Sequence, residues 1–77
     1  MTQRERVLDH LEKHGTITPM EAINELGIMR LGARIWDLRH DGHDIRRNMI
    51  TSKNRYGDTV SYAEYRLVKG EDADAIQ

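Results

Sequence analysis

The chain has 77 residues, a net charge of −1, no cysteine and no phenylalanine. A chain of this length forms one small domain, and the lack of cysteine excludes disulfide bonds, thiol catalysis and cysteine-based zinc sites. No apolar run approaches the roughly 20 residues of a membrane-spanning helix, and the charged N-terminus does not resemble a signal peptide. We therefore expect a cytoplasmic protein without a membrane partner. Its core has to be filled by aliphatic side chains together with Trp36, Tyr56, Tyr62 and Tyr65.

The charge is unevenly distributed along the chain. It is −2 over residues 1–29, +4 over residues 30–69 and −3 over residues 70–77. Because the basic charge concentrates in the second of these segments, an anionic partner is indicated. The last segment is acidic, small and without a pattern, so we expect a single domain at 1–69 followed by an acidic disordered tail at 70–77.

A first helix is expected from Thr2 to His14. Thr2 and Glu5 form the T-x-x-E pattern of a capping box. Gly15 then follows as a helix stop. The apolar residues at helical spacing in between are Val7, Leu8 and Leu11.

A second, short helix is expected after Thr18. Thr18 caps it, Pro19 suits the first helical position, and Glu21 completes another capping box. Gly27 ends the helix. Its expected buried stripe consists of Ala22, Ile23 and Leu26.

A third helix is expected over residues 30–41. Leu31, Ile35 and Leu38 recur at i, i+4 and i+7 and define its buried side. An Asp-Gly pair ends the helix, whereas Met29 stands where a capping Ser or Thr is usual.

After residue 43 the pattern changes from helical to extended. Residues 44–53 and 59–68 are rich in β-branched and aromatic side chains, and the second segment alternates between two faces. Asn54 and Gly57 lie between them and favour a tight turn. This order of elements predicts an α+β fold, a winged helix-turn-helix with three helices followed by a β-hairpin wing.

The side of the third helix that faces away from the core is the candidate DNA-reading surface. On a helical wheel, the residues that point outwards are Arg30, Ala33, Asp37 and His40, and Arg34 and Trp36 lie on the two shoulders. Ala33 lets the helix approach a surface closely, and an arginine can bond to guanine or to a phosphate. Asp37 would be repelled by phosphates unless it pairs with Arg34. The alternative is that these charges form an ordinary solvated helix face.

Trp36 and Arg39 flank the buried side of this helix. Trp36 either folds over the edge of the core, or it is exposed and anchors a protein interface or stacks on nucleotides. Arg39 is expected to pack its stem along the core and expose its guanidinium.

The expected hairpin turn is a second candidate contact surface. It carries Lys53, Asn54, Arg55 and Tyr56. Basic residues on a wing neutralise phosphates or enter a narrow minor groove. A solvated turn without a partner is the alternative.

Three further residues are candidate phosphate contacts. Arg46 and Arg47 are adjacent on an expected strand and therefore point to opposite faces, so at most one of them contacts a phosphate. Thr16 precedes the second helix, where free backbone N–H groups often bind a phosphate.

No catalytic or cofactor-binding motif appears in the sequence. His10 and His14 share one helix face, but local spacing supplies no third metal ligand and H-E-x-x-H is absent. We therefore expect no metal, no cofactor, no catalytic residue and no enzymatic activity.

The segments GTITPMEAINELGIMRLGARIWDLRHDGHDI, RYG and AEYRL resemble the small winged helix-turn-helix proteins that are common in phages and prophages. The resemblance covers about residues 2–68. It implies double-stranded DNA as the partner and a role as a transcriptional regulator or a recombination accessory factor. It also implies that Arg30, Ala33 and Arg34 face the groove and that the segment 53–56 forms the wing.

Two functions remain open at this point. The first is sequence-specific DNA binding, with the protein acting as a homodimer. The second is a protein-binding module on the same fold, such as a phage-encoded inhibitor of a host or defence protein, which the near-neutral charge and Trp36 favour. Both place the protein in a cytoplasm, that of the host cell for a phage protein.

Overall fold

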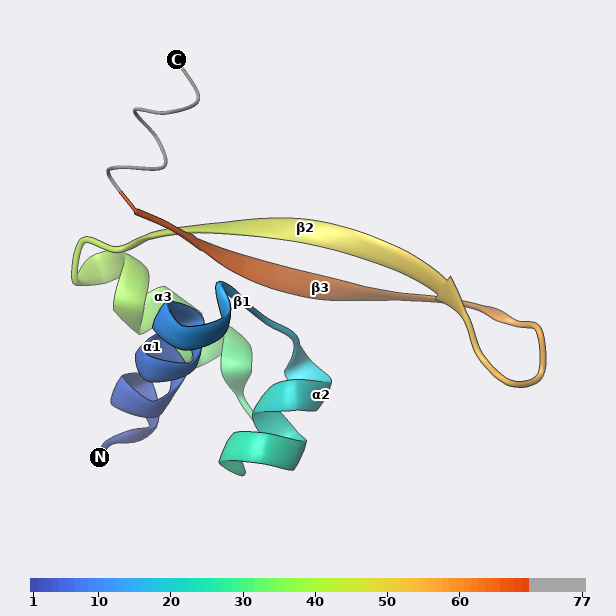
Figure 1. The fold of residues 1–77 in the computed structure, drawn as a ribbon, viewed down its shortest axis with the longest axis horizontal. Coiled ribbons are helices and arrows are strands. Elements are labelled where there is room, and N and C mark those ends of the chain that lie inside the picture. Colours follow the sequence, from blue (N-terminus) through green and yellow to red (C-terminus); the bar gives the residue numbers. More distant parts are fainter. Residues whose placement is uncertain (70–77) are drawn as a thin grey trace, which may run out of the picture.

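The computed structural model describes residues 1–69, and the expected tail at 70–77 lies outside the described residues. The elements in chain order are α1 (Gln3–His14), β1 (Thr16–Ile17), α2 (Pro19–Glu21), the π-helical turn η1 (Ala22–Leu26), α3 (Leu31–His40), β2 (Asp44–Lys53) and β3 (Thr59–Val68). Figure 1 shows the helices gathered on one side of a long, twisted hairpin. None of the described helices has the length and apolar character needed to cross a membrane.

The predicted limits of the first helix are confirmed. The Thr2 hydroxyl accepts a hydrogen bond from the Glu5 amide at 3.2 Å, and the Glu5 carboxylate accepts one from the Thr2 amide at 3.0 Å. At the other end Gly15 has a φ of 86°, and its N–H donates to the Leu11 carbonyl at 2.7 Å. Only glycine adopts that backbone conformation without strain, so the helix stops there.

The second helix begins as predicted but does not continue as a regular α-helix. Thr18 and Glu21 form the expected capping box, and Gly27 ends the segment in the left-handed conformation with φ 69°. Between them the chain passes from three α-helical residues into a π turn. The prediction that Ile23 is buried is wrong, since 41% of this residue is exposed. Ile28, after Gly27, is fully buried instead.

The sheet has three strands in the order β1-β3-β2. β2 and β3 pair antiparallel, with Ile45 opposite Leu67 and Lys53 opposite Thr59, which confirms the predicted hairpin. The strand β1 was not predicted, so the expected order of three helices followed by a hairpin lacks one element. It pairs with β3 through Thr16 and Ile17 alone. Two residues are too short to show the alternation by which a strand is recognised.

The core is aliphatic. Its nine buried residues are Val7, Leu11, Ile17, Ala22, Ile28, Leu31, Ile35, Leu38 and Ile45. Of the aromatic residues expected in the core, only Tyr65 packs against it. Trp36, Tyr56 and Tyr62 are exposed, so that expectation is wrong for them. Tyr56 lies in the turn between β2 and β3, at the tip of the hairpin that projects beyond the helices (Figure 1). Tyr62 lies on β3 and borders a pocket with Pro19 and Met20 of α2, outside the core.

Candidate nucleic-acid interface

Helix α3 is fixed to the body by its predicted buried side. Leu31, Ile35 and Leu38 are all at most 3% exposed. The N-cap is Arg30, one residue later than the expected Met29, and it makes no side-chain capping bond, so the expected poor cap is confirmed at a shifted position. An uncapped first turn leaves backbone N–H groups at the start of α3 without a side-chain partner.

The opposite side of α3 is open to solvent. The exposed residues of α3 are Gly32, Ala33, Trp36, Arg39 and His40, and of these Arg39 lies beside β2. Trp36 does not fold over the core edge: 59% of it is exposed, and its indole stacks on the imidazole of His40 with ring centroids 3.6 Å apart. The exposure of His40 agrees with its outward position on the helical wheel, and its i, i+4 spacing from Trp36 brings the two rings together.

Arg34, an expected DNA contact, is held by two neighbouring side chains. Its Nε lies 3.1 Å from the Asp37 carboxylate, and its Nη1 donates to the Gln3 side chain at 3.3 Å. The pair with Asp37 is the i, i+3 interaction that the sequence left open, although the Nε–H does not point well enough at the carboxylate to make a hydrogen bond. Because Gln3 belongs to α1, Arg34 and Asp37 join α3 to the first helix. Their side chains are only about 30% exposed.

Arg39 holds the end of α3 against the hairpin. Its Nε donates to the Ile45 carbonyl at 2.9 Å, so the guanidinium is bonded to the backbone of β2 and is not simply exposed to water as expected. At the same end, Arg4 forms an ion pair with Asp41 at 3.1 Å. These contacts fix where β2 leaves the helices.

The hairpin tip carries the predicted basic residues on an ordered turn. The Asn54 side-chain oxygen accepts hydrogen bonds from the Tyr56 amide at 2.9 Å and the Asp58 amide at 3.1 Å. Asn54 therefore shapes the turn, and its expected contact with DNA stays a prediction. Lys53, Arg55 and Tyr56 are exposed beside it.

The register of the hairpin separates the two adjacent arginines as predicted. Arg46 lies opposite Arg66, whereas Arg47 lies opposite Tyr65, a residue that packs on the core. Residues opposite one another share a face, so Arg46 and Arg66 are on the outer face of the sheet. Thr16 is paired with Arg66 and is half-buried, which places it on the same outer face.

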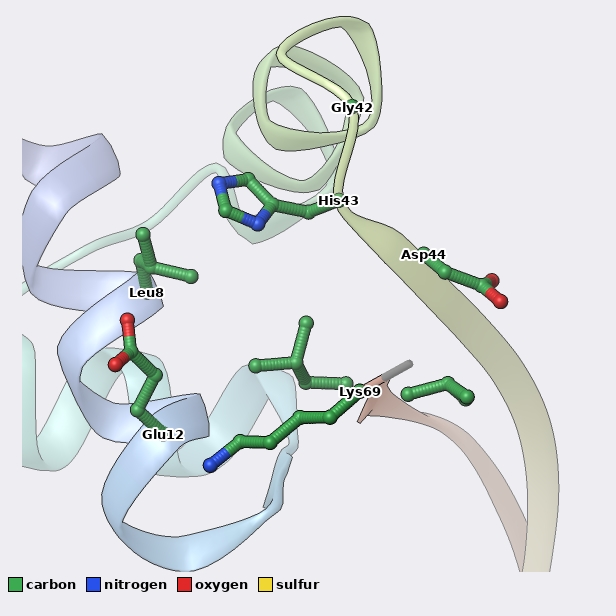
Figure 2. A pocket seen from close by; sticks show the side chains of 8 residues that line it. Leu8, Glu12, Gly42, His43, Asp44 and Lys69 are labelled. Carbon is green, nitrogen blue, oxygen red and sulfur yellow. The ribbon is translucent and has the colours of Figure 1, made fainter. Parts of the chain in front are cut away.

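A pocket of about 530 Å³ lies between α1, the start of β2 and the end of β3. Figure 2 shows the His43 imidazole directed towards Leu8, with Glu12 and Lys69 at the other side and the Asp44 carboxylate turned away. The pocket uses none of the exposed residues of α3 or of the hairpin turn. It is therefore separate from the candidate nucleic-acid interface.

The element order, the three-stranded sheet and the open face of α3 together have the form of a winged helix-turn-helix. Comparison with protein families gives a match over residues 2–70 to the winged helix-turn-helix domain. None of the curated proteins and none of the solved structures matches this chain significantly. The match covers nearly all of the chain, so the protein belongs to the winged helix-turn-helix domain family, for which DNA is the implied partner.

Proposed function

We propose that the protein binds double-stranded DNA with α3 in the major groove and the hairpin turn on the neighbouring backbone or minor groove. The open face of α3 carries this proposal. A helix enters the major groove only if side chains from the rest of the domain leave that face uncovered. The exposed Gly32 and Ala33 add no bulk between the α3 backbone and the base edges.

Arg30 is the residue best placed to contact a base. It lies at the N-terminus of α3, the end of a recognition helix that usually reaches the bases. It is exposed and forms no ion pair with another residue between 1 and 69. Arg34, which pairs with Asp37 and bonds to Gln3, positions α3 on α1. Trp36 and His40 form the rest of the exposed face of α3.

Lys53 and Arg55 supply the phosphate contacts. Neither forms an ion pair within the described part of the chain, and the turn between them is ordered by Asn54. A phosphate contact neutralises charge and releases counterions whatever the sequence, so these residues contribute affinity and salt dependence. Thr16, on the outer face of the sheet, is a further candidate contact.

The cellular role that we propose is that of a phage-type transcriptional regulator or recombination accessory factor, working as a homodimer. It is supported by the resemblance to small phage and prophage proteins and by the size of the domain. A single small domain reads few base pairs, and two copies on adjacent half-sites extend the sequence that is recognised.

The test is fluorescence-anisotropy binding to a pool of double-stranded fragments over a salt series. We expect the logarithm of the affinity to fall linearly with the logarithm of salt concentration, by about 0.9 per phosphate contact. The double variant Lys53→Ala/Arg55→Ala should reduce this slope by about 2. Arg30→Ala should cost about 1–3 kcal/mol on the preferred fragment, and Arg34→Ala should cost less because Asp37 and Gln3 hold its guanidinium.

Arg6→Ala is the matched control, because Arg6 is an exposed arginine of α1, outside the proposed interface. It should leave both affinity and slope unchanged. If the wild-type protein binds no fragment even at low salt, the DNA proposal is wrong. That result would favour the second candidate, a protein-binding module such as a phage-encoded inhibitor of a host or defence protein, with the exposed Trp36 and Met29 as anchors.

A further inference from the structure

His10 is a buried polar side chain without a bonding partner. It lies on the inner side of α1, is only 6% exposed, and is the one buried residue with a polar side chain among residues 1–69. Its Nε2 is shielded from solvent and has no hydrogen-bond partner. An imidazole that is removed from water in this way loses its hydrogen bonds to solvent, and this costs free energy unless another group replaces them.

Two carboxylates face this imidazole from the second helix. One side-chain nitrogen of His10 and one oxygen each from Glu21 and Glu25 lie within 4.8 Å of one another. Glu21 uses one oxygen to accept the Thr18 amide at 2.9 Å. Neither glutamate forms an ion pair with a basic residue in the described part of the chain, and His10 is not within 4.0 Å of either carboxylate.

This cluster holds two like charges beside a buried imidazole whose Nε2 has no hydrogen-bond partner. The carboxylates repel each other, and no arginine or lysine between residues 1 and 69 forms an ion pair with them. A divalent cation would relieve both problems, because it attracts the two oxygens and accepts the lone pair of the imidazole. A mixed set of one imidazole and two carboxylates suits zinc and related transition metals better than magnesium or calcium, which prefer oxygen ligands alone.

The distances are compatible with such an ion after small side-chain rotations. Zinc binds nitrogen and oxygen ligands at about 2.0–2.2 Å, which places neighbouring ligands of a tetrahedral site about 3.4 Å apart. The ligand atoms now lie within 4.8 Å of one another, and the exposed Glu25 side chain can rotate to bring its oxygen closer to the other two. It lies in the π turn η1, and such turns are frequent at functional sites.

We propose that His10, Glu21 and Glu25 bind one zinc-type divalent metal ion, with water in the remaining coordination position. The ion fastens α1 to the second helix. The sequence interpretation found no third ligand because it searched by local spacing from His10 and His14. Both glutamates come from another helix, more than ten residues away in sequence.

The test is zinc titration of the chelator-treated full-length chain, followed by calorimetry and by thermal unfolding. We expect one ion per chain and a higher Tm with zinc than with chelator, because an ion that binds only the folded state stabilises it. Glu25→Gln and Glu21→Gln should each weaken zinc binding at least about 10-fold. Glutamine at position 21 also fits the capping box, so that variant retains the helix start.

The matched controls are His14→Gln and Glu12→Gln, which change exposed residues of the same helix outside the cluster. Both should bind zinc as the wild-type protein does. The proposal is wrong if the wild-type chain shows no heat of binding and no Tm shift, if the Glu21 and Glu25 variants bind zinc undiminished, or if His14→Gln alone abolishes binding. None of these results bears on DNA binding, which does not use the three ligands.

Discussion

Glu5 shows how a single exposed residue stabilises the start of a helix. Its carboxylate accepts the Thr2 amide, and its own amide donates to the Thr2 hydroxyl. The hydrogen bond from the Thr2 backbone, followed by that with its side chain, holds the pKa of Glu5 below its ordinary value. The ionised form is therefore favoured in the folded protein.

This lowered pKa predicts a small pH dependence of stability. A carboxyl group with a depressed pKa stabilises the fold at pH values above its pKa in the unfolded chain, and this contribution is lost as the pH falls through the folded-state pKa. Glu5→Gln keeps the capping box and removes the titration. We expect the free energy of unfolding of the wild-type protein to fall more steeply with decreasing pH, in this acidic range, than that of the variant.

The measurement is urea unfolding of both proteins from neutral pH to below pH 4, together with an NMR titration of the Glu5 carboxyl. Equal pH dependence of the two proteins, with a Glu5 pKa at the ordinary value of about 4.3, would contradict the prediction.

Arg34 illustrates the limit of such local reasoning. Its ion pair with Asp37, three residues away, could be considered from the sequence, whereas its hydrogen bond to Gln3, 31 residues away, could not.

At the scale of the element, the segment from Thr18 to Ile28 departs most from its sequence pattern. A regular helical wheel places Ile23 in the buried stripe, but the π turn changes the number of residues per turn. The Ile28 amide then donates to the Ala22 carbonyl at 2.9 Å, and the Ile28 side chain fills the core. Gly27 makes this return of the chain possible through its left-handed conformation.

Two glycine substitutions should therefore have opposite effects. Gly27→Ala forces alanine to adopt a φ of 69°, which costs about 1–2 kcal/mol of stability although no atom obstructs the new methyl group. Gly32 lies inside α3 with open space around it, so Gly32→Ala should stabilise the protein by about 0.5–1 kcal/mol. Urea unfolding of the two variants measures both. A stabilised Gly27→Ala would show that the left-handed turn is not required.

At the scale of the whole molecule, a small aliphatic core supports a domain whose aromatic residues are largely on the surface. Small domains are stable by only about 5–15 kcal/mol. Ile35→Ala leaves a cavity in the core and should cost about 2–5 kcal/mol, a large part of the total. Trp36→Ala, at the next position, should cost under about 1 kcal/mol because its side chain is mostly exposed.

Chemical denaturation of this neighbouring pair compares one buried and one exposed position on the same helix. A larger loss for Trp36→Ala than for Ile35→Ala would mean that the indole packs in the core. The first sequence interpretation of Trp36 would then be right after all.

How much of the molecule the sequence predicts depends on the distance over which residues interact. The capping boxes, the buried side of α3 and the hairpin follow from neighbouring residues, and all three are confirmed. The strand β1 depends on β3, almost 50 residues later, and the cluster at His10 depends on another helix. The candidate DNA-reading residues Arg30 and Ala33 are exposed as predicted, and their contact with DNA remains a prediction.

The strand order affects how readily copies of the protein aggregate. β2 is an edge strand over its full length, and β1 covers β3 only at Thr16 and Ile17, so most backbone groups on both edges of the hairpin lack a neighbouring strand within residues 1–69. Open edges of this kind recruit other strands and aggregate, and charged side chains are the usual protection. The basic residues of β2 therefore also protect the protein from aggregation, because their like charges keep copies of the hairpin apart. Replacing Arg46, Arg47 and Lys53 together by neutral residues removes this repulsion.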